Sequence, residues 1–216
     1  RLSRHLAKRF IALLTIRLKS VVDALGRTET YNHGAIGRIT TQKRLDGRAI
    51  HYSYDANGNL TSITPPGKTV HRFAYNPLDL PAQYTPPALA EVTEPETRYE
   101  YNLDKQLTQI VRPDGQTVVF NYQPTAGRLD SVSLPHGQLS YSYDVTTGNL
   151  STVTAPDNST LSYSYDGSLP LSETWDNGFI KGTLALTYDN DFRVTASRIN
   201  EANTINYQYD TDSLLV

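Results

Sequence analysis

Tyr141-Ser142-Tyr143-Asp144-Val145-Thr146-Thr147-Gly148-Asn149-Leu150 is the clearest copy of a motif that recurs along almost the whole chain. Aligning the second tyrosine of each copy gives a period of about 21 residues, which is typical of stacked structural repeats. The aligned residues are Tyr31, Tyr54, Tyr75, Tyr101, Tyr122, Tyr143, Tyr165, Tyr188 and Tyr209. Two residues earlier stands a mostly aromatic column: Glu29, Tyr52, Phe73, Tyr99, Phe120, Tyr141, Tyr163, Leu186 and Tyr207.

Each copy predicts a β-hairpin. The alternation of aromatic and polar residues places both rings on one face of an extended strand. The Asp or Asn that usually follows caps a turn with its side chain, and a glycine supplies a positive φ before the next strand. A second alternating strand follows, such as Leu150-Ser151-Thr152-Val153-Thr154, and it is rich in β-branched residues.

Proline-containing turns end these second strands and complete the repeat. Examples are Pro65-Pro66-Gly67, Arg112-Pro113-Asp114-Gly115, Leu134-Pro135-His136-Gly137 and Ala155-Pro156-Asp157-Asn158. Because a lone hairpin is marginal in water, we expect neighbouring repeats to pair into a continuous, curved antiparallel sheet. The predicted fold is therefore all-β, with about nine repeats over residues 21–216, starting from the degenerate copy at Asp23-Ala24-Leu25-Gly26-Arg27-Thr28 and ending in an incomplete one.

Residues 1–20 do not follow this pattern and form a basic leader with six basic residues and no acidic one. The spacing of Leu2, Leu6, Phe10, Leu13, Leu14 and Leu18 favours a short amphipathic helix, with a poorly ordered segment as the alternative. A targeting role is a further alternative, although no small-residue cleavage site follows the apolar stretch. The chain begins at Arg1 without methionine, so we interpret it as part of a longer protein.

Two copies depart from the period. The segment Pro81 to Pro95 is longer and proline-rich, which predicts an elongated surface turn, with a contact loop as the alternative. The only tryptophan, Trp175, precedes Asp176-Asn177-Gly178, a strong hairpin signal. We expect Trp175 to be packed, although it could also anchor a partner.

Composition argues against several functions. The chain has no cysteine, so it can form neither a disulfide nor a thiolate metal site. Outside residues 1–20 it carries 14 basic and 22 acidic residues, which argues against nucleic acid as a partner. No apolar run reaches the roughly 20 residues of a membrane span.

No catalytic, cofactor-binding or metal-binding residues are predicted. The five histidines, His5, His33, His51, His71 and His136, lack the spacing of metal ligands on a helix, and no Gly-x-Ser-x-Gly motif occurs. Asp189-Asn190-Asp191 and Asp210-Thr211-Asp212 are only partly similar to calcium loops, because they lack the glycine and the distant glutamate. We therefore predict a protein that is not an enzyme.

The copies of Tyr-Asp-x-x-Gly-Asn/Arg-Leu, such as Tyr54 to Leu60 and Tyr143 to Leu150, resemble the YD repeats of Rhs proteins. Relatives with such repeats are the C components of insecticidal toxin complexes, bacterial wall-associated proteins and the animal teneurins. The resemblance covers about residues 21 to 216 and implies a hollow β-sheet shell around a toxic C-terminal domain, in a secreted or cell-surface protein.

This resemblance implies a structural segment of such a shell, whose partners are the rest of the parent protein and its toxin cargo. One alternative is a cell-surface adhesion module that binds a glycan or another protein through its aromatic face. A second alternative is a truncated remnant without function. Because the terminal strands of a partial sheet lack partners, we also expect self-association through its open edges.

Overall fold

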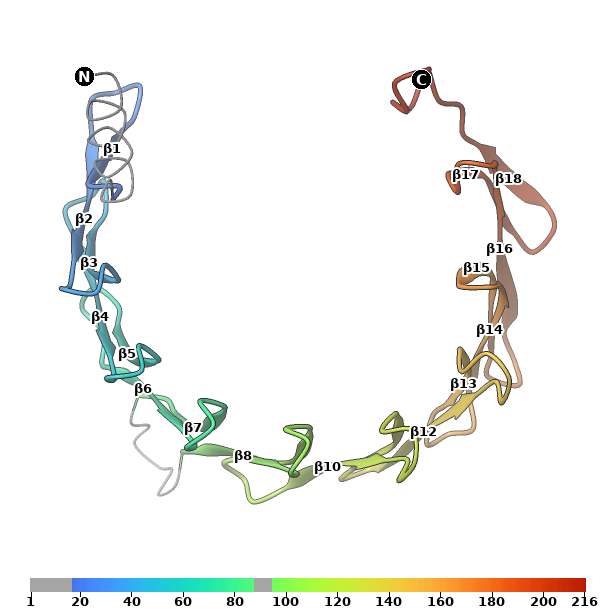
Figure 1. Ribbon diagram of the computed structural model, residues 1–216, viewed down its shortest axis with the longest axis horizontal. Helices are drawn as coiled ribbons and strands as arrows, with labels where there is room; N and C mark the ends of the chain where they lie inside the picture. Colours follow the sequence, from blue (N-terminus) through green and yellow to red (C-terminus); the bar gives the residue numbers. More distant parts are fainter. Residues whose placement is uncertain (1–16, 88–94) are drawn as a thin grey trace, which may run out of the picture. The chain divides into compact units, whose positions relative to one another are not determined.

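The computed structural model describes residues 17–87 and 95–216, and this part of the chain consists of eighteen strands joined by turns, without a helix. The all-β prediction is confirmed. The chain divides into two compact units, residues 1–100 with 111–115 and residues 101–110 with 116–216. Within each unit the strands follow one another in chain order (Figure 1).

In the first unit, every strand pairs antiparallel with the next along the chain. Its strands are β1 (Ser20–Val22), β2 (Thr28–His33), β3 (Ile39–Lys43), β4 (Ala49–Tyr54), β5 (Leu60–Thr64), β6 (His71–Tyr75), β7 (Pro81–Thr85) and β8 (Thr97–Tyr101). The predicted pairing of hairpin to hairpin is therefore present, since β3 pairs with β4 as it does with β2.

The second unit repeats this meander, and its longest strands are β15 and β16, of eight residues each. Its strands are β9 (Leu107–Val111), β10 (Thr117–Tyr122), β11 (Leu129–Leu134), β12 (Gly137–Tyr143), β13 (Leu150–Thr154), β14 (Thr160–Asp166), β15 (Leu169–Asp176), β16 (Lys181–Tyr188), β17 (Val194–Ile199) and β18 (Asn203–Asn206). A β-bulge recurs just before the motif tyrosine, as between Ser142 and Tyr143.

Each unit is a single layer of sheet without a conventional core. Val132, 6% exposed, is the only buried apolar residue in the described ranges. The motif tyrosines are half-buried, whereas residues between two rings, such as Ser53 and Ser142, are exposed. The chain exposes 15721 Å², compared with about 10,000 Å² for a compact protein of this mass. Most stabilisation therefore comes from contacts within and between neighbouring hairpins.

The structure corrects the alignment of the first copy. His33, and not Tyr31, pairs with Ile39 just as Tyr54 pairs with Leu60. Gly34 then takes the place of Asp55, because Gly34 N–H bonds to Arg38 C=O as Asp55 N–H bonds to Asn59 C=O. Alignment on tyrosine alone was wrong here, because His33 occupies the position that the second tyrosine takes in other copies.

The Asp23–Arg27 turn is also reassigned. It joins β1 to β2, so it lies on the same edge as the Arg44–Arg48 turn between β3 and β4 and opposite the Asp55–Asn59 turn. Its Asp-x-x-Gly-Arg sequence produces the same local hydrogen bonds as the motif turns, which explains why it was predicted as a copy of the motif. The sequence of a turn therefore does not show by itself at which edge of the sheet the turn lies.

The structure describes the beginning of the irregular segment Pro81 to Pro95. The predicted Pro81–Pro95 turn is wrong at its start, because Pro81–Thr85 forms strand β7; residues 88–94 of this segment lie outside the described residues. Tyr84 pairs with Phe73, in the place that Ile63 takes opposite Tyr52, and the rings of Tyr84 and Phe73 stack at 5.3 Å. The second-strand pattern therefore continues into the proline-rich segment.

The predicted leader is mostly outside the described residues, which start at Arg17. Ser20, the last residue of the predicted leader, begins β1. Arg17 already makes a repeat-like contact, because its guanidinium donates to the Gly34 carbonyl at 3.4 Å. The contacts of the repeat therefore extend to Arg17.

The Trp175 hairpin is confirmed. Asp176 pairs with Lys181 across a turn formed by residues 177–180, and the Trp175 ring lies over its cross-strand partner Gly182. Gly182 is buried, and an added Cβ would collide with the indole. Trp175 is therefore packed against backbone, as expected.

We predict that Gly182→Ala destabilises the second unit by about 1–3 kcal/mol, because the new methyl group displaces the Trp175 ring. Urea unfolding followed by circular dichroism as well as Trp175 fluorescence measures this change, because circular dichroism also reports the first unit, where Gly34 lies. Gly34→Ala is the matched control, since Gly34 has no positive φ and its added Cβ would meet only the Thr40 methyl closely, at 3.2 Å. Equal effects of the two substitutions would contradict the proposed packing.

Candidate functional site

The most ordered groups of side chains lie at the junctions between successive repeats, at the edge that carries the motif turns. The Asp or Asn of each motif shapes its own turn. Asp55 accepts from the backbone N–H of Asn59 at 2.8 Å, and Asn76 accepts from Leu78 and Leu80 at 2.9 and 3.0 Å. The residue two positions before the second strand adopts a positive φ, as in Gly58 (φ 86) before Leu60. This geometry matches a type I turn closed by a left-handed residue.

The second tyrosine of the motif ties its repeat to the preceding one. Tyr143 donates its hydroxyl hydrogen to the carbonyl of Leu129, the residue that begins the second strand of the previous repeat, at 2.8 Å. The same bond recurs from Tyr54 to Ile39, Tyr75 to Leu60, Tyr122 to Leu107, Tyr188 to Pro170 and Tyr209 to Val194, at 2.7 to 3.0 Å. The column of tyrosines is therefore selected for the hydroxyl as well as for the ring.

The residue after the turn glycine makes a second tie, in the opposite direction along the chain. Arg128 donates to the Gly148 carbonyl of the following turn at 2.8 Å, and its guanidinium lies 4.5 Å from the centre of the Tyr143 ring. Residues at the same motif position make similar bonds. Gln106 and Asn149 donate to the carbonyls of Gly127 and Gly167, whereas Asn59 and Arg193 donate to the side chains of Asp79 and Ser213. We call the tyrosine bond and this bond together the junction ties.

A lack of space adds to the conformational requirement at two turn glycines. The Arg38 guanidinium packs against Gly58 and lies 5.5 Å from the Tyr54 ring centre, and Arg128 packs against Gly148. A Cβ at Gly58 would collide with Arg38, and its positive φ also disfavours any other residue. The motif glycine therefore allows the conformation of its own turn and leaves room for the arginine of the preceding repeat.

Several turn carboxylates have pKa values below their usual range. Hydrogen bonds from the Thr147 backbone and hydroxyl lower the pKa of Asp144, and the Arg193 backbone N–H is the main cause of the lowered pKa of Asp189. At Asp55, burial would raise the pKa, but hydrogen bonds from Asn59 and nearby backbone outweigh it. Burial also raises the pKa of Tyr143, against the opposing effect of Arg128.

The junction ties connect each turn to a neighbouring repeat through hydrogen bonds. Within residues 17–87 and 95–216, no group of three or more His, Asp or Glu side chains is placed to hold a metal ion. Asp189 pairs with Arg193 at 2.8 Å and Asp210 accepts from Leu214 N–H, so these two partly calcium-like loops use their carboxylates in their own turns. In the same ranges no helix has the length and apolar character of a membrane span.

A sheet of hairpins joined by tyrosine ties and left-handed turns defines the YD-repeat class of β proteins. The sequence matches the Teneurin YD-shell family over residues 15–215, and the chain belongs to this family. The resemblance to YD-repeat proteins predicted from the motif is therefore confirmed. A search of curated protein sequences found no significant match.

Solved structures show the same fold. This chain is similar to a chain in the structure of TcdB2-TccC3-Cdc42, with 18% identity and a TM-score of 0.63. It is also similar to TcdB2-TccC3 without its hypervariable C-terminal region, with 17% identity and a TM-score of 0.61. Each match covers 87% of this chain but only 12% of the other, so the chain spans about an eighth of those proteins.

We predict that Tyr122→Phe lowers the free energy of unfolding of the second unit by about 0.5–1.5 kcal/mol, because it leaves the Leu107 carbonyl without its hydroxyl donor. Tyr165→Phe is the matched control, since none of the hydrogen bonds in the described part involves the Tyr165 hydroxyl. Urea unfolding monitored by circular dichroism and Trp175 fluorescence measures both variants. A larger loss in Tyr165→Phe than in Tyr122→Phe would contradict the role of the tie.

We also predict that acid weakens the fold through the turn carboxylates. Since their folded pKa values are lowered, their contribution is complete above the unfolded value of about 4 and is lost as the pH falls through the folded values. The urea midpoint should therefore decrease steadily as the pH falls below about 4. Asp144→Asn retains an acceptor without titrating, so it should reduce this pH dependence; an unchanged dependence would exclude Asp144 as a contributor.

Proposed function

We propose that this chain is a non-enzymatic wall segment of a YD-repeat shell that encloses a C-terminal toxin and helps deliver it as part of a longer, secreted or cell-surface protein. The observation that carries the proposal is the junction tie. Most repeats bond to their neighbours through groups that are built into the motif, and the sheet in each unit remains one layer thick. Such a strip extends by adding repeats and separates two spaces without a core of its own.

The family supports a wall over the alternatives. The chain belongs to a YD-shell family and spans 12% of the TcdB2-TccC3 chains, as a segment of a larger wall would. One of those structures lacks a hypervariable C-terminal region, which fits a variable cargo at that position in the parent protein. The partners proposed for this chain are the rest of its parent and that cargo.

The other functions predicted from the sequence have less support. Six of the motif tyrosines donate their hydroxyl hydrogens to backbone carbonyls. Most of the aromatic face therefore has few free polar groups for a glycan or protein ligand. The forward tie recurs in five repeats with Arg, Asn or Gln as its donor, and this regularity favours a wall over a remnant without function. Self-association through open sheet edges stays a prediction.

Cross-linking in the full-length parent tests the wall directly. A photoreactive benzoylphenylalanine at Tyr141 lies on the aromatic face of β12, and one at Ser142 lies on the opposite face. We expect cross-links to the C-terminal region from only one of these two positions, because only one face of a wall meets its contents. Mass spectrometry of the cross-linked peptides reads the result.

Two outcomes would contradict the proposal. Cross-links to the C-terminal region from neither position would mean that this segment does not line the cargo space. Comparable cross-links from both would mean that it does not separate inside from outside. A variant with the photoreactive residue at Val145, a 98% exposed turn position, controls for nonspecific capture.

A further inference from the structure

One junction in the second unit lacks its tyrosine tie. Tyr143 and Tyr188 bond to the carbonyls of Leu129 and Pro170, but Tyr165 makes no such bond to Leu150. Tyr165 is half-buried, and its ring lies tilted at 33° to that of Tyr163, with 6.4 Å between the centres. The Tyr165 hydroxyl therefore does not donate to the Leu150 carbonyl, although six other motif tyrosines make the corresponding hydrogen bond.

The lengths of two neighbouring turns explain this exception. The turn from Asp144 to Asn149 is one residue longer than that from Asp55 to Asn59, with the Asp144 N–H bonded to the Asn149 carbonyl. The next motif turn is shorter, because Asp166 pairs with Leu169 and leaves only Gly167 and Ser168 between the strands. A long turn beside a short one leaves space between them.

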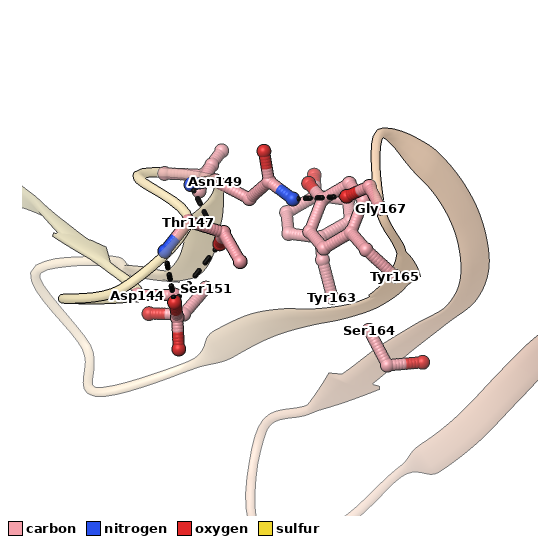
Figure 2. A pocket seen from close by; sticks show the side chains of 9 residues that line it. Asp144, Thr147, Asn149, Ser151, Tyr163, Ser164, Tyr165 and Gly167 are labelled. Carbon is pink, nitrogen blue, oxygen red and sulfur yellow. Dashed lines mark hydrogen bonds between the residues drawn. The ribbon is translucent and has the colours of Figure 1, made fainter.

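The space is a hollow of about 220 Å³. It lies between the Asp144–Leu150 turn and the end of β14, and its lining includes Asp144, Thr147, Asn149, Ser151, Tyr163 and Tyr165. Figure 2 shows the Asn149 amide reaching across to the Gly167 carbonyl, which closes one side of the hollow at 2.6 Å. At this junction the bond from Asn149 is therefore present, although the bond from the motif tyrosine is missing.

The chemistry of this lining suits one class of ligand. Two tyrosine side chains offer aromatic surface, and the faces of such rings attract weakly positive C–H groups. The Tyr165 hydroxyl, the Ser151 hydroxyl and the Leu150 carbonyl offer both donors and acceptors. The only charged lining group is Asp144, whose pKa is lowered by its Thr147 hydrogen bonds, so the site disfavours anions.

We propose that this hollow binds a single neutral sugar ring, with its C–H face on the tyrosine side chains and its hydroxyls on the Tyr165 hydroxyl and the Leu150 carbonyl. The volume is below the roughly 300–1,000 Å³ of pockets for drug-sized ligands, which fits one pyranose ring. Asp144 is the only carboxylate in the lining, so the hollow lacks the several oxygen ligands that a metal cation needs. This inference does not depend on the proposed function.

Saturation-transfer NMR on the full 216-residue chain tests the site with the methyl glycosides of glucose, galactose, mannose and N-acetylglucosamine. We expect weak binding of at least one of these sugars and none of glucuronic acid. Tyr165→Phe should weaken that binding about fivefold, since it removes one hydrogen bond to the ligand. Its urea midpoint should stay unchanged, because the hydroxyl has no partner in the protein.

Tyr122→Phe gives the converse control, because its hydroxyl bonds to Leu107 and lies in another repeat. It should lose stability and keep the same sugar affinity as the unmodified chain. The proposal is overturned if none of the methyl glycosides binds at concentrations up to tens of millimolar, if Tyr165→Phe leaves their affinity unchanged, or if tetramethylammonium binds more tightly than any of them. None of these results would alter the cross-linking expected of the wall.

Discussion

The hydrogen bond from a motif tyrosine to the carbonyl that begins the second strand of the previous repeat is the interaction on which each unit depends. A single-layer sheet cannot bury enough apolar surface to specify its own arrangement, and Val132 is the only buried apolar residue in the described ranges. Backbone pairing alone would also allow a hairpin to slip in register. The tyrosine tie selects one register, because a two-residue slip would move the ring away from its acceptor.

The second tie favours the same register, but its donor belongs to the earlier of the two repeats. Arg128 reaches forward to Gly148 while Tyr143 reaches back to Leu129, and the guanidinium lies over the ring of that tyrosine. Both bonds join the same two repeats near the same edge, so each holds the other's side chain in position. A cation over an aromatic ring contributes about 0.5–1 kcal/mol at exposed sites, in addition to the hydrogen bonds.

Much of this fold could be predicted from the sequence because the motif combines several local signals. Alternating aromatics, a turn-capping Asp or Asn and a glycine at a positive φ each predict the hairpin on their own. The ties could not be predicted in this way, since their acceptors lie about one repeat away and most of them are backbone carbonyls, which have no signature in sequence. The recurrence of Asn, Arg or Gln just before the second strand is the available signal in the sequence.

The errors have a related cause. The first copy was aligned on Tyr31 because sequence comparison favours identical residues, whereas pairing with Ile39 is set by His33. The hollow beside Tyr165 was missed because it arises from the difference in length between two turns, neither of which is unusual alone. Sequence therefore indicates what each repeat is, while features that depend on two repeats together require coordinates.

Backbone acceptors also explain how the fold persists when sequences diverge. A carbonyl oxygen is present whatever residue occupies its position, so Leu129, Ile39, Pro170 and Val194 all serve the tyrosine equally. The forward tie requires only a donor of sufficient reach, which Arg, Asn and Gln each provide. A structure held in this way restricts few positions per repeat, and a TM-score of 0.63 at 18% identity is the expected consequence. Even the turn glycine is replaced in this chain, since Asp79, Lys105, Phe192 and Ser213 adopt the same positive φ in their turns. Where Tyr165 remains without its tie, its hydroxyl is free for another use.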